Sequence, residues 1–174
     1  MLPRQLGRRR DVLLGYHQYV DSARRAQLAL PDLALATDLI VGFPTETDAA
    51  FNKTFEVVRE LSFSKLHVFR YSPRPGTAAA ALDDVVSPNT KKARSKALIE
   101  LGNEIRRHWL ARHLERPLAV LVEDERIADD VHVCSGQTDD YVRVWFEGEG
   151  LLGNIYEVVG ERVRADGIQG CLRR

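Results

Sequence analysis

Cysteine is scarce in this sequence of 174 residues. The two cysteines, Cys134 and Cys171, stand 37 positions apart. That spacing matches no metal-binding motif, and two cysteines do not resemble the disulfide framework of a secreted domain. We therefore expect both to be buried small hydrophobic residues in a protein of a reducing compartment.

Long apolar runs are also missing. No stretch approaches the roughly 20 apolar residues that span a bilayer, and the basic first ten residues are not followed by the apolar segment of a signal peptide. With 44% hydrophobic and 29% charged residues, the composition is that of an ordinary globular protein. We expect a soluble, cytoplasmic protein with no membrane partner.

Familiar catalytic signatures are absent as well. The sequence contains no G-x-S-x-G, P-loop, G-x-G-x-x-G or H-E-x-x-H motif. His108 and His113 are five residues apart on a predicted helix, so they point about 140° apart and are not expected to share a metal. We predict structural histidines, no catalytic residue and no metal ligand.

Charge is balanced overall, with 25 basic and 25 acidic residues, but it is unevenly distributed. Residues 88–116 hold eight basic and three acidic residues, whereas residues 117–174 hold six basic and twelve acidic ones. Solvated helix faces are the common explanation of such runs. The alternative is that the basic stretch contacts a polyanion such as RNA.

The first 116 residues show an α/β pattern. Apolar residues at helical spacing predict helices over 11–29, from the capping residues 45–48 to Leu61, and from Ser87-Pro88 to about Leu114. Apolar runs at 33–41 and 65–71 predict two buried parallel strands with crossover helices. Two strands cannot close a barrel, so we expect this region to be the back portion of something longer.

At Pro117 the hydrophobic period changes from 3.6 to 2. Five short strands are predicted between Leu118 and Leu172, most of them separated by turns that contain glycine. Such a series is typical of a small OB-like β-barrel. We therefore predict two domains, residues 1–116 and residues 117–174.

Two loops follow the predicted parallel strands, at the strand ends where α/β proteins form ligand sites. The first spans residues 37–47, with Gly42 letting a backbone approach and Pro44 fixing a turn. The second spans residues 68–77 and contains two prolines and a glycine. Tight turns that merely close the strands are the alternative interpretation.

The two loops carry the motifs D-L-I-V-G-F-P-T-E at 38–46 and V-F-R-Y-S-P-R-P-G-T at 68–77. Together with the long basic helix and the small β-barrel, they resemble the radical-SAM tRNA methylthiotransferases over nearly the whole chain. The resemblance implies an α/β partial radical-SAM barrel (its last two strands and helices) followed by a small all-β OB-like TRAM barrel. Residues 67–69 and 136–144 are similar to the branch that acts on N6-threonylcarbamoyladenosine next to the tRNA anticodon.

The resemblance also implies cofactors. Full-length members of the family use S-adenosylmethionine and four-iron four-sulfur clusters, which are held by three cysteines at C-x-x-x-C-x-x-C spacing and by three more in an N-terminal domain. Neither set is present in this sequence, and thiolates are what hold such clusters. We expect this chain to hold no cluster stably and to be inactive alone, with the missing N-terminal part of the same enzyme as a partner.

The same resemblance implies site residues. The S-adenosylmethionine adenine and ribose would be bordered by Ile40, Gly42, Phe43, Pro44, Phe69, Tyr71 and Ser72. Tyr141 and Arg143 would face RNA through stacking and phosphate contact, with an aromatic packed inward on an ordinary strand as the alternative. Weak, salt-sensitive tRNA binding is predicted from the basic residues Lys91, Lys92, Arg94, Arg106 and Arg107.

Three interpretations of function stay open. A truncated tRNA methylthiotransferase is the favoured one. The second is a non-catalytic RNA-binding module made of the barrel and its basic helix. The third is a reading frame with no function of its own.

Overall fold

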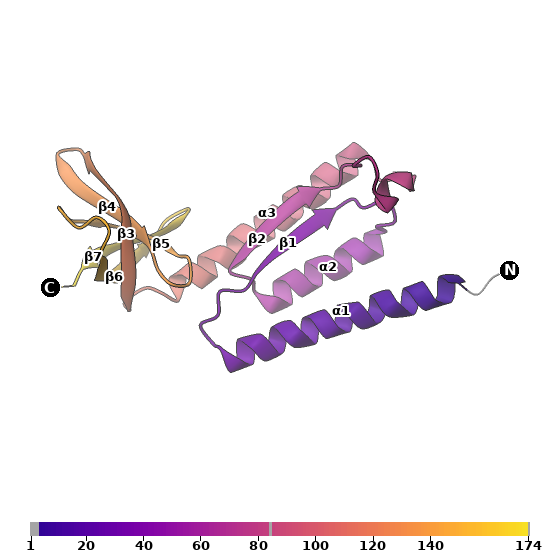
Figure 1. Ribbon diagram of the computed structural model, residues 1–174, viewed down its shortest axis with the longest axis horizontal. Coiled ribbons are helices and arrows are strands. Elements are labelled where there is room, and N and C mark those ends of the chain that lie inside the picture. Colours follow the sequence, from indigo (N-terminus) through magenta and orange to yellow (C-terminus); the bar gives the residue numbers. More distant parts are fainter. Residues whose placement is uncertain (1–3, 84, 174) are drawn as a thin grey trace. The chain divides into compact units, whose positions relative to one another are not determined.

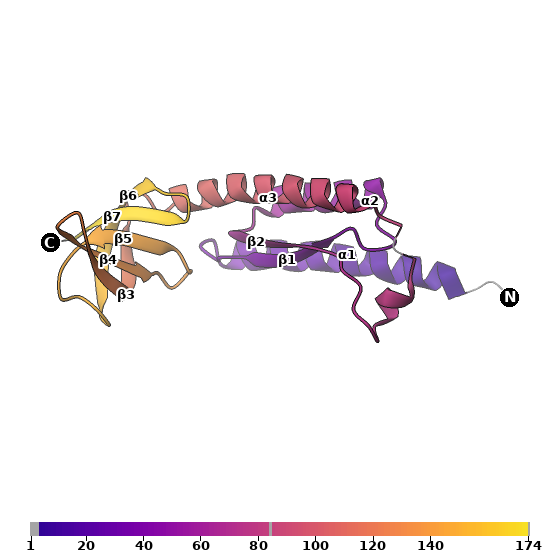
Figure 2. The ribbon, with the colours of Figure 1, turned by 90° about the horizontal axis from the view of Figure 1, so that it is seen from above.

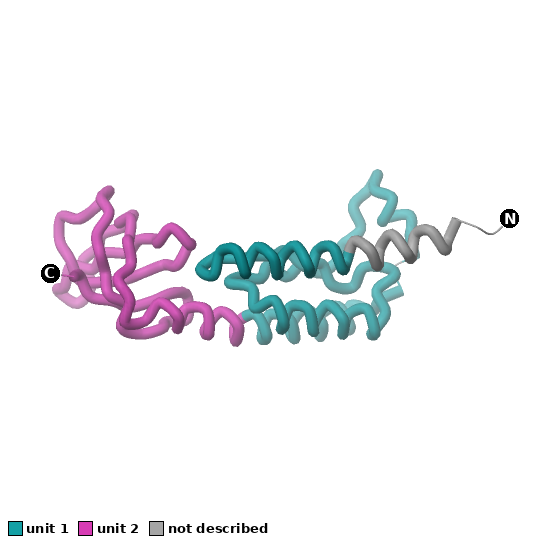
Figure 3. The backbone as a smooth tube through the Cα atoms, turned by 90° about the horizontal axis from the view of Figure 1, so that it is seen from below, with its two compact units in different colours: residues 1–102 teal, residues 103–174 magenta. Residues whose placement is uncertain are grey.

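The computed structural model describes the backbone of residues 4–83 and 85–173, and their side chains from Tyr16 onward. The chain divides into two compact units, residues 1–102 and residues 103–174 (Figure 3). The helix α3 (Pro88–Ala111) begins in the first unit and ends in the second.

Parallel strands and helices alternate in the first unit. The order is α1 (Arg4–Ala29), β1 (Ala36–Val41), α2 (Asp48–Leu61), β2 (Lys65–Arg70), a 3₁₀ turn (Ala78–Ala81) and then α3. β1 and β2 pair in parallel, from Ala36 opposite Lys65 to Val41 opposite Arg70. The α/β prediction for this region is confirmed.

Local side-chain chemistry sets the helix starts. The hydroxyl oxygen of Thr47 accepts a hydrogen bond from the Ala50 amide at 3.1 Å, and α2 begins at the next residue, Asp48. Ser87 accepts from the Thr90 amide at 3.1 Å in the same way, and Pro88 occupies the first position of α3. Both caps satisfy amide groups that the first helical turn leaves unpaired.

The two-stranded sheet is covered on one face. α2 and α3 lie on the same side of β1 and β2 in both ribbon views (Figures 1 and 2). The core of this unit contains five side chains that are at most 2% exposed: Val41, Val58, Leu61, Phe63 and Leu98. Exposure alternates along both strands, so the opposite face carries Ile40 and Phe69, which are 59% and 53% exposed.

Five strands make up most of the second unit: β3 (Pro117–Ala128), β4 (Val131–Gln137), β5 (Arg143–Glu147), β6 (Ile155–Val163) and β7 (Gly167–Leu172). They pair in the order β3-β4-β5-β7-β6, and the pairing of β6 with β3 closes the barrel. β5 and β7 are parallel, whereas the other pairs are antiparallel. The five predicted strands are all present.

No helix within the described residues is both long enough and apolar enough to cross a bilayer.

Candidate functional site

The loop after β1 makes a tight, internally bonded turn. Gly42 has a φ of 74°, a conformation that favours glycine. Its amide donates to the Glu46 carboxylate at 2.6 Å, and the Glu46 amide donates to the Phe43 carbonyl at 2.8 Å. Gly42 and Pro44 are buried, whereas Phe43 is 37% exposed. The turn therefore presents the Phe43 ring while its backbone stays covered.

The loop after β2 meets this turn. The Tyr71 amide donates to the Val41 carbonyl at 2.8 Å, which extends the pairing of the two strands by one step. The rings of Phe43 and Tyr71 are in edge contact, with centroids 5.4 Å apart. The two motif loops therefore touch at the carboxyl end of the sheet, as parallel pairing requires.

The predicted cofactor-bordering residues fall at this end of the sheet. Ile40 and Phe69 are register partners on the uncovered face, so they form a small apolar ledge. Tyr71 is half-buried and Ser72 is exposed. The hydroxyl oxygen of Tyr71 is buried and has no hydrogen-bond partner among the described residues. This orphaned polar atom lies on the ring that contacts Phe43.

Arg94 of α3 is the main side chain that fixes the first loop. Its guanidinium donates to the Glu46 carboxylate and to the Asp48 carboxylate, each at 2.6 Å, and to the Glu46 carbonyl at 3.2 Å. The side chains of Arg94 and Glu46 are only 8% and 13% exposed. Burial disfavours the charge of Arg94, but the hydrogen bonds that Arg94 donates to Asp48 and Glu46 outweigh this effect and raise its pKa.

Lys91 packs one turn earlier on the same helix. A Cβ on Gly42 would lie 2.3 Å from Lys91 Cγ, so the lysine stem fills the space beside the glycine. The Lys91 ammonium lies 5.2 Å from the centre of the Tyr71 ring. The first turns of α3 thus reach both motif loops.

Lys91 and Arg94 were predicted to contact RNA, but both side chains are buried in the protein. They are 8% and 7% exposed, and Arg94 is hydrogen-bonded within the protein. Lys92 and Arg107 are exposed, and Arg106 is half-buried. Burial lowers the pKa of Arg106, and the nearby Asp140 and Asp166 counteract that effect. Exposed charge on α3 thus resides at positions such as Lys92 and Arg107.

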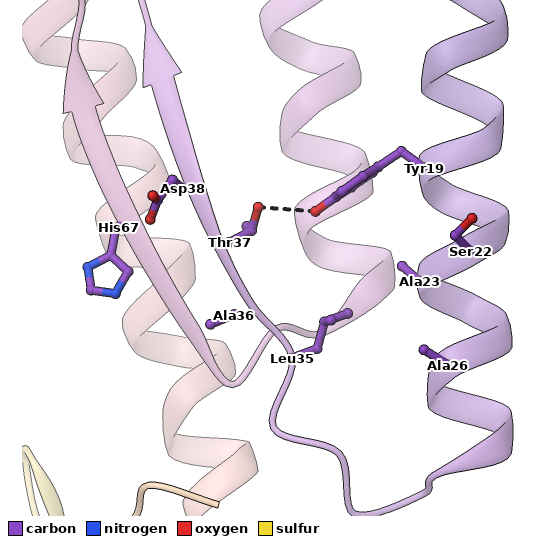
Figure 4. Close-up of a pocket in the computed structure, with 9 residues that line it drawn as sticks. All are labelled: Tyr19, Ser22, Ala23, Ala26, Leu35, Ala36, Thr37, Asp38 and His67. Atoms are coloured by element: carbon purple, nitrogen blue, oxygen red, sulfur yellow. Dashed lines mark hydrogen bonds between the residues drawn. The ribbon is translucent and has the colours of Figure 1, made fainter.

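A shallow groove lies at the other end of β1. It runs between α1 and the start of β1 and is lined mostly by small or apolar side chains, with Tyr19 bonded to Thr37 at 3.0 Å (Figure 4). Asp38 and His67 stand opposite each other on β1 and β2, away from α1. None of the predicted cofactor-bordering residues lines this groove.

Tyr141 is the one aromatic residue among the predicted RNA contacts. Its side chain is 78% exposed, so it does not pack inward on a strand. It lies in the turn before β5, outside the strand that begins at Arg143. Arg143 is half-buried and contacts Ser135 and Glu123, at 3.3 and 3.5 Å. Sequence reasoning missed the side chains that hold this turn, which are His113, Thr138 and Asp140.

One cysteine prediction is wrong. Cys134 is buried and its thiol donates to the Gly148 carbonyl at 3.2 Å, whereas Cys171 is exposed. Cys171 lies at an outward-facing position of β7, because strand alternation places it opposite the buried Gly170. Among the described residues, no three histidine, cysteine or acidic side chains are grouped closely enough to hold a metal ion.

Comparison with known proteins adds the last line of evidence. No family model matches the chain. Threonylcarbamoyladenosine tRNA methylthiotransferase MtaB of Bacillus subtilis is 36% identical over 142 residues, which are 80% of this chain and 32% of that protein. MtaB of Thermotoga maritima is also 36% identical, over 81% of this chain and 32% of its own length. The tRNA-2-methylthio-N(6)-dimethylallyladenosine synthase of Geobacillus kaustophilus is 39% identical, over 81% of this chain and 27% of its own length.

The chain thus spans about a third of the length of these curated relatives. By sequence, this chain is a relative of the tRNA methylthiotransferases and corresponds to a C-terminal part of such a protein.

Proposed function

We propose that this chain is the C-terminal part of a tRNA methylthiotransferase. In this proposal the α/β unit supplies one wall of an S-adenosylmethionine site, and the barrel is an OB-like TRAM domain that contacts tRNA. The methylthio group would be added to N6-threonylcarbamoyladenosine next to the anticodon. Two of the relatives cited are named for that nucleoside, and the third is named for the dimethylallyl one.

The observation that carries the proposal is the meeting of the two motif loops. Phe43 and Tyr71 are in ring contact at the carboxyl end of the sheet, and Ile40 and Phe69 form an exposed apolar pair on its uncovered face. A flat apolar ledge with a few polar groups suits an adenine ring. The unpaired hydroxyl of Tyr71 is a buried polar atom of the kind that a bound group or a water satisfies.

The residues present fit S-adenosylmethionine on one side only. Ile40, Phe43 and Phe69 could contact its base, whereas the space beside Gly42 is filled by the Lys91 stem. When bound in such enzymes, the cofactor supplies the radical chemistry. Cys134 and Cys171 do not fit an iron–sulfur cluster, because Cys134 is buried, Cys171 is exposed and no third thiol exists. The chain alone is therefore proposed to be inactive.

A non-catalytic RNA-binding module is the second candidate. The closed five-stranded barrel and the exposed ring of Tyr141 favour it, because neither feature needs a cluster or S-adenosylmethionine. The two candidates differ in what the motif loops bind.

Nuclear magnetic resonance separates them. The ¹⁵N-labelled full chain is titrated with S-adenosylhomocysteine, a probe that carries the same adenosine, and separately with tRNA. Shifts at the amides of Gly42, Phe43 and Tyr71, which Phe69→Ser diminishes, support the enzyme part. Undisturbed loops together with tRNA binding support the module instead, and a chain that binds neither probe contradicts both candidates.

Cluster reconstitution gives a further prediction. After treatment with iron and sulfide under reducing, oxygen-free conditions, the chain should retain no cluster, because it lacks clustered thiols. Iron and sulfide analysis and the visible absorption spectrum provide the measurement. A Cys134→Ser/Cys171→Ser variant is the matched control and should give the same spectrum. Stoichiometric iron with a cluster absorption band in the unaltered chain alone would contradict this expectation.

Salt dependence tests the contact with tRNA. We expect weak binding, with a dissociation constant of about 10⁻⁴ to 10⁻⁶ M, that falls as salt rises. Each of Lys92→Gln and Arg107→Gln should reduce the slope of log affinity against log salt by roughly 0.7 to 0.9, because each removes one exposed cation from the phosphate contact. Arg126→Gln, on the exposed side of β3, is the control and should leave the slope unchanged. Binding that does not depend on salt would disprove the phosphate contact.

A further inference from the structure

Tyr141 occupies an unusual backbone conformation. Its φ is 62°, in the left-handed region that bulky side chains rarely adopt. The ring is 78% exposed, so no packing within the protein accounts for that conformation. Val142, which follows Tyr141, and Thr138, three residues before it, are buried, at 0% and 7% exposure. Strain that the surrounding structure maintains in this way points to a function of the strained residue.

Thr138 and Asp140 hold the turn in this conformation. The Tyr141 amide donates to the Thr138 carbonyl at 3.1 Å, and the Thr138 amide donates to the Val142 carbonyl at 3.0 Å. The Thr138 hydroxyl accepts from the Val142 amide at 2.9 Å and donates to one oxygen of the Asp140 carboxylate. The position of Asp140 therefore sets the shape of the turn.

His113 in turn holds Asp140. Its Nε2 lies 2.6 Å from the second oxygen of the Asp140 carboxylate, and its Nδ1 lies 3.1 Å from the Trp109 carbonyl oxygen. A carbonyl and a carboxylate both accept hydrogen bonds and donate none. Both ring nitrogens must therefore carry a proton for the two bonds to exist together, so the geometry demands the imidazolium form. A neutral ring loses one of the two bonds.

The charges around the ring agree with this geometry. The hydrogen bond to Asp140 raises the pKa of His113, against the effects of burial and of the nearby Arg112. Burial alone would raise the pKa of Asp140, but the hydrogen bonds from His113 and Thr138 lower it. Arg106 on α3 also faces Asp140, and Asp166 lies near Arg106. The imidazolium is thus stabilised by an ionised partner in a half-buried setting.

We propose that His113 is a positioning residue, which as an imidazolium holds Asp140 and the 138–142 turn so that Tyr141 presents its ring for stacking on an unpaired nucleobase of RNA. This inference rests on the proposed function, because it assumes that the barrel contacts tRNA. It assigns the recognition to stacking, which every base allows.

Charge favours a base over a phosphate as the group that meets Tyr141. Residues 117–174 hold twelve acidic and six basic side chains, and the exposed Asp139 stands two residues before Tyr141 in the sequence. A phosphate would be repelled there, whereas the uncharged face of a base would not. The alternative is that Tyr141 contacts a protein partner. The affinity of the chain for RNA decides between the two.

The link from His113 through Asp140 to the 138–142 turn, called the brace, is tested first without RNA. A proton spectrum of the full chain follows the His113 ring from pH 5.5 to 9, while ¹⁵N spectra follow the amides of Tyr141 and Val142. Because a raised pKa favours the protonated form, the turn should persist below the usual histidine pKa of about 6.5 and rearrange only as pH rises through the higher value of His113. The amides should titrate with the ring in the unaltered chain and lose that coupling in Asp140→Asn. If the chemical shifts of these amides do not follow the titration of the His113 ring, the proposed brace does not exist.

The second measurement is affinity for a short single-stranded RNA at constant salt. Tyr141→Ala should weaken binding about 5- to 150-fold, as expected for one lost base stack, whereas Tyr141→Phe should retain it. Affinity of the unaltered chain should fall along the same pH curve as the His113 ring. His113→Gln should show low affinity with no such curve, and His108→Gln, on the exposed part of α3, should behave as the unaltered chain.

The outcomes separate this inference from the proposal beneath it. If Tyr141→Ala binds RNA as tightly as the unaltered chain, the stacking role is wrong and the proposed function still stands. Unaltered chain that binds no RNA at any pH overturns the proposed function and the stacking role together. Binding with the predicted pH curve and the predicted loss in Tyr141→Ala supports both.

Discussion

Gly136→Ala is expected to lower the free energy of unfolding of the barrel by about 3 kcal/mol, at the upper end of ordinary overpacking effects. Gly136 is buried in β4, which pairs with β3 on one side and β5 on the other. A Cβ there would lie 2.0 Å from the Leu121 carbonyl oxygen and 2.9 Å from a Val120 methyl carbon. Because the obstacle is backbone, the two strands must separate and lose hydrogen bonds.

Urea unfolding followed by tryptophan fluorescence provides the measurement, since Trp145 lies in the adjoining strand β5. Gly150→Ala is the matched control. Nothing lies within 4 Å of a Cβ at Gly150. That variant should therefore lose only the roughly 1–2 kcal/mol of stability that a side chain costs at a φ of 69°. Equal losses in the two variants would show that the β3–β4 contact is not close, and would contradict the expectation for Gly136.

Arg94→Gln is expected to produce the second large effect, in the α/β unit. The substitution removes the positive charge that faces the Glu46 carboxylate. The Glu46 side chain is only 13% exposed. Among the hydrogen bonds of the described residues, the one from the Gly42 amide then remains to this carboxylate. Breaking one side of a buried ion pair costs about 3–5 kcal/mol, and the residual exposure of Glu46 places the expected loss near the lower end. The loop 42–46 should loosen with it.

Hydrogen exchange of individual amides reports that loss in the correct unit. Protection of the Gly42 and Glu46 amides should fall most in Arg94→Gln, and the barrel amides should be unaffected. Asp48→Asn is the control, because the Asp48 side chain is 92% exposed and its pair with Arg94 is well solvated; its effect should stay below about 1 kcal/mol. If Arg94→Gln protects Gly42 as well as the unaltered chain does, the proposed role of Arg94 in holding the loop is wrong.

The periodic features of the sequence predicted much of the fold. Two apolar runs became the parallel strands β1 and β2, and the Ser87-Pro88 pair begins α3. The switch to alternation after Pro117 predicted the five barrel strands. These signals are local, because a strand's alternation and a helix's cap depend on residues a few positions apart.

Lys91 and Arg94 show where charge alone misled the interpretation. They stand three apart on α3 and continue backward the stripe of Leu98, Leu101 and Ile105, which are buried. Their spacing therefore carried the signal that they face inward, although their charge favoured a surface contact with RNA. The acidic partners Glu46 and Asp48 lie more than 40 residues earlier, and no local pattern predicts that pairing.

By itself the sequence determined which segments become helices or strands, that β1 and β2 run in parallel, and that two glycine- and proline-bearing motifs follow them. Only the tertiary structure decided which distant groups meet: Arg94 with Glu46, Phe43 with Tyr71, and His113 with Asp140. It also decided the strand order, in which β7 lies between β5 and β6. The physical reason is that backbone periodicity is set by near neighbours, whereas a buried ion pair or a closed barrel depends on groups brought together by packing of the whole unit.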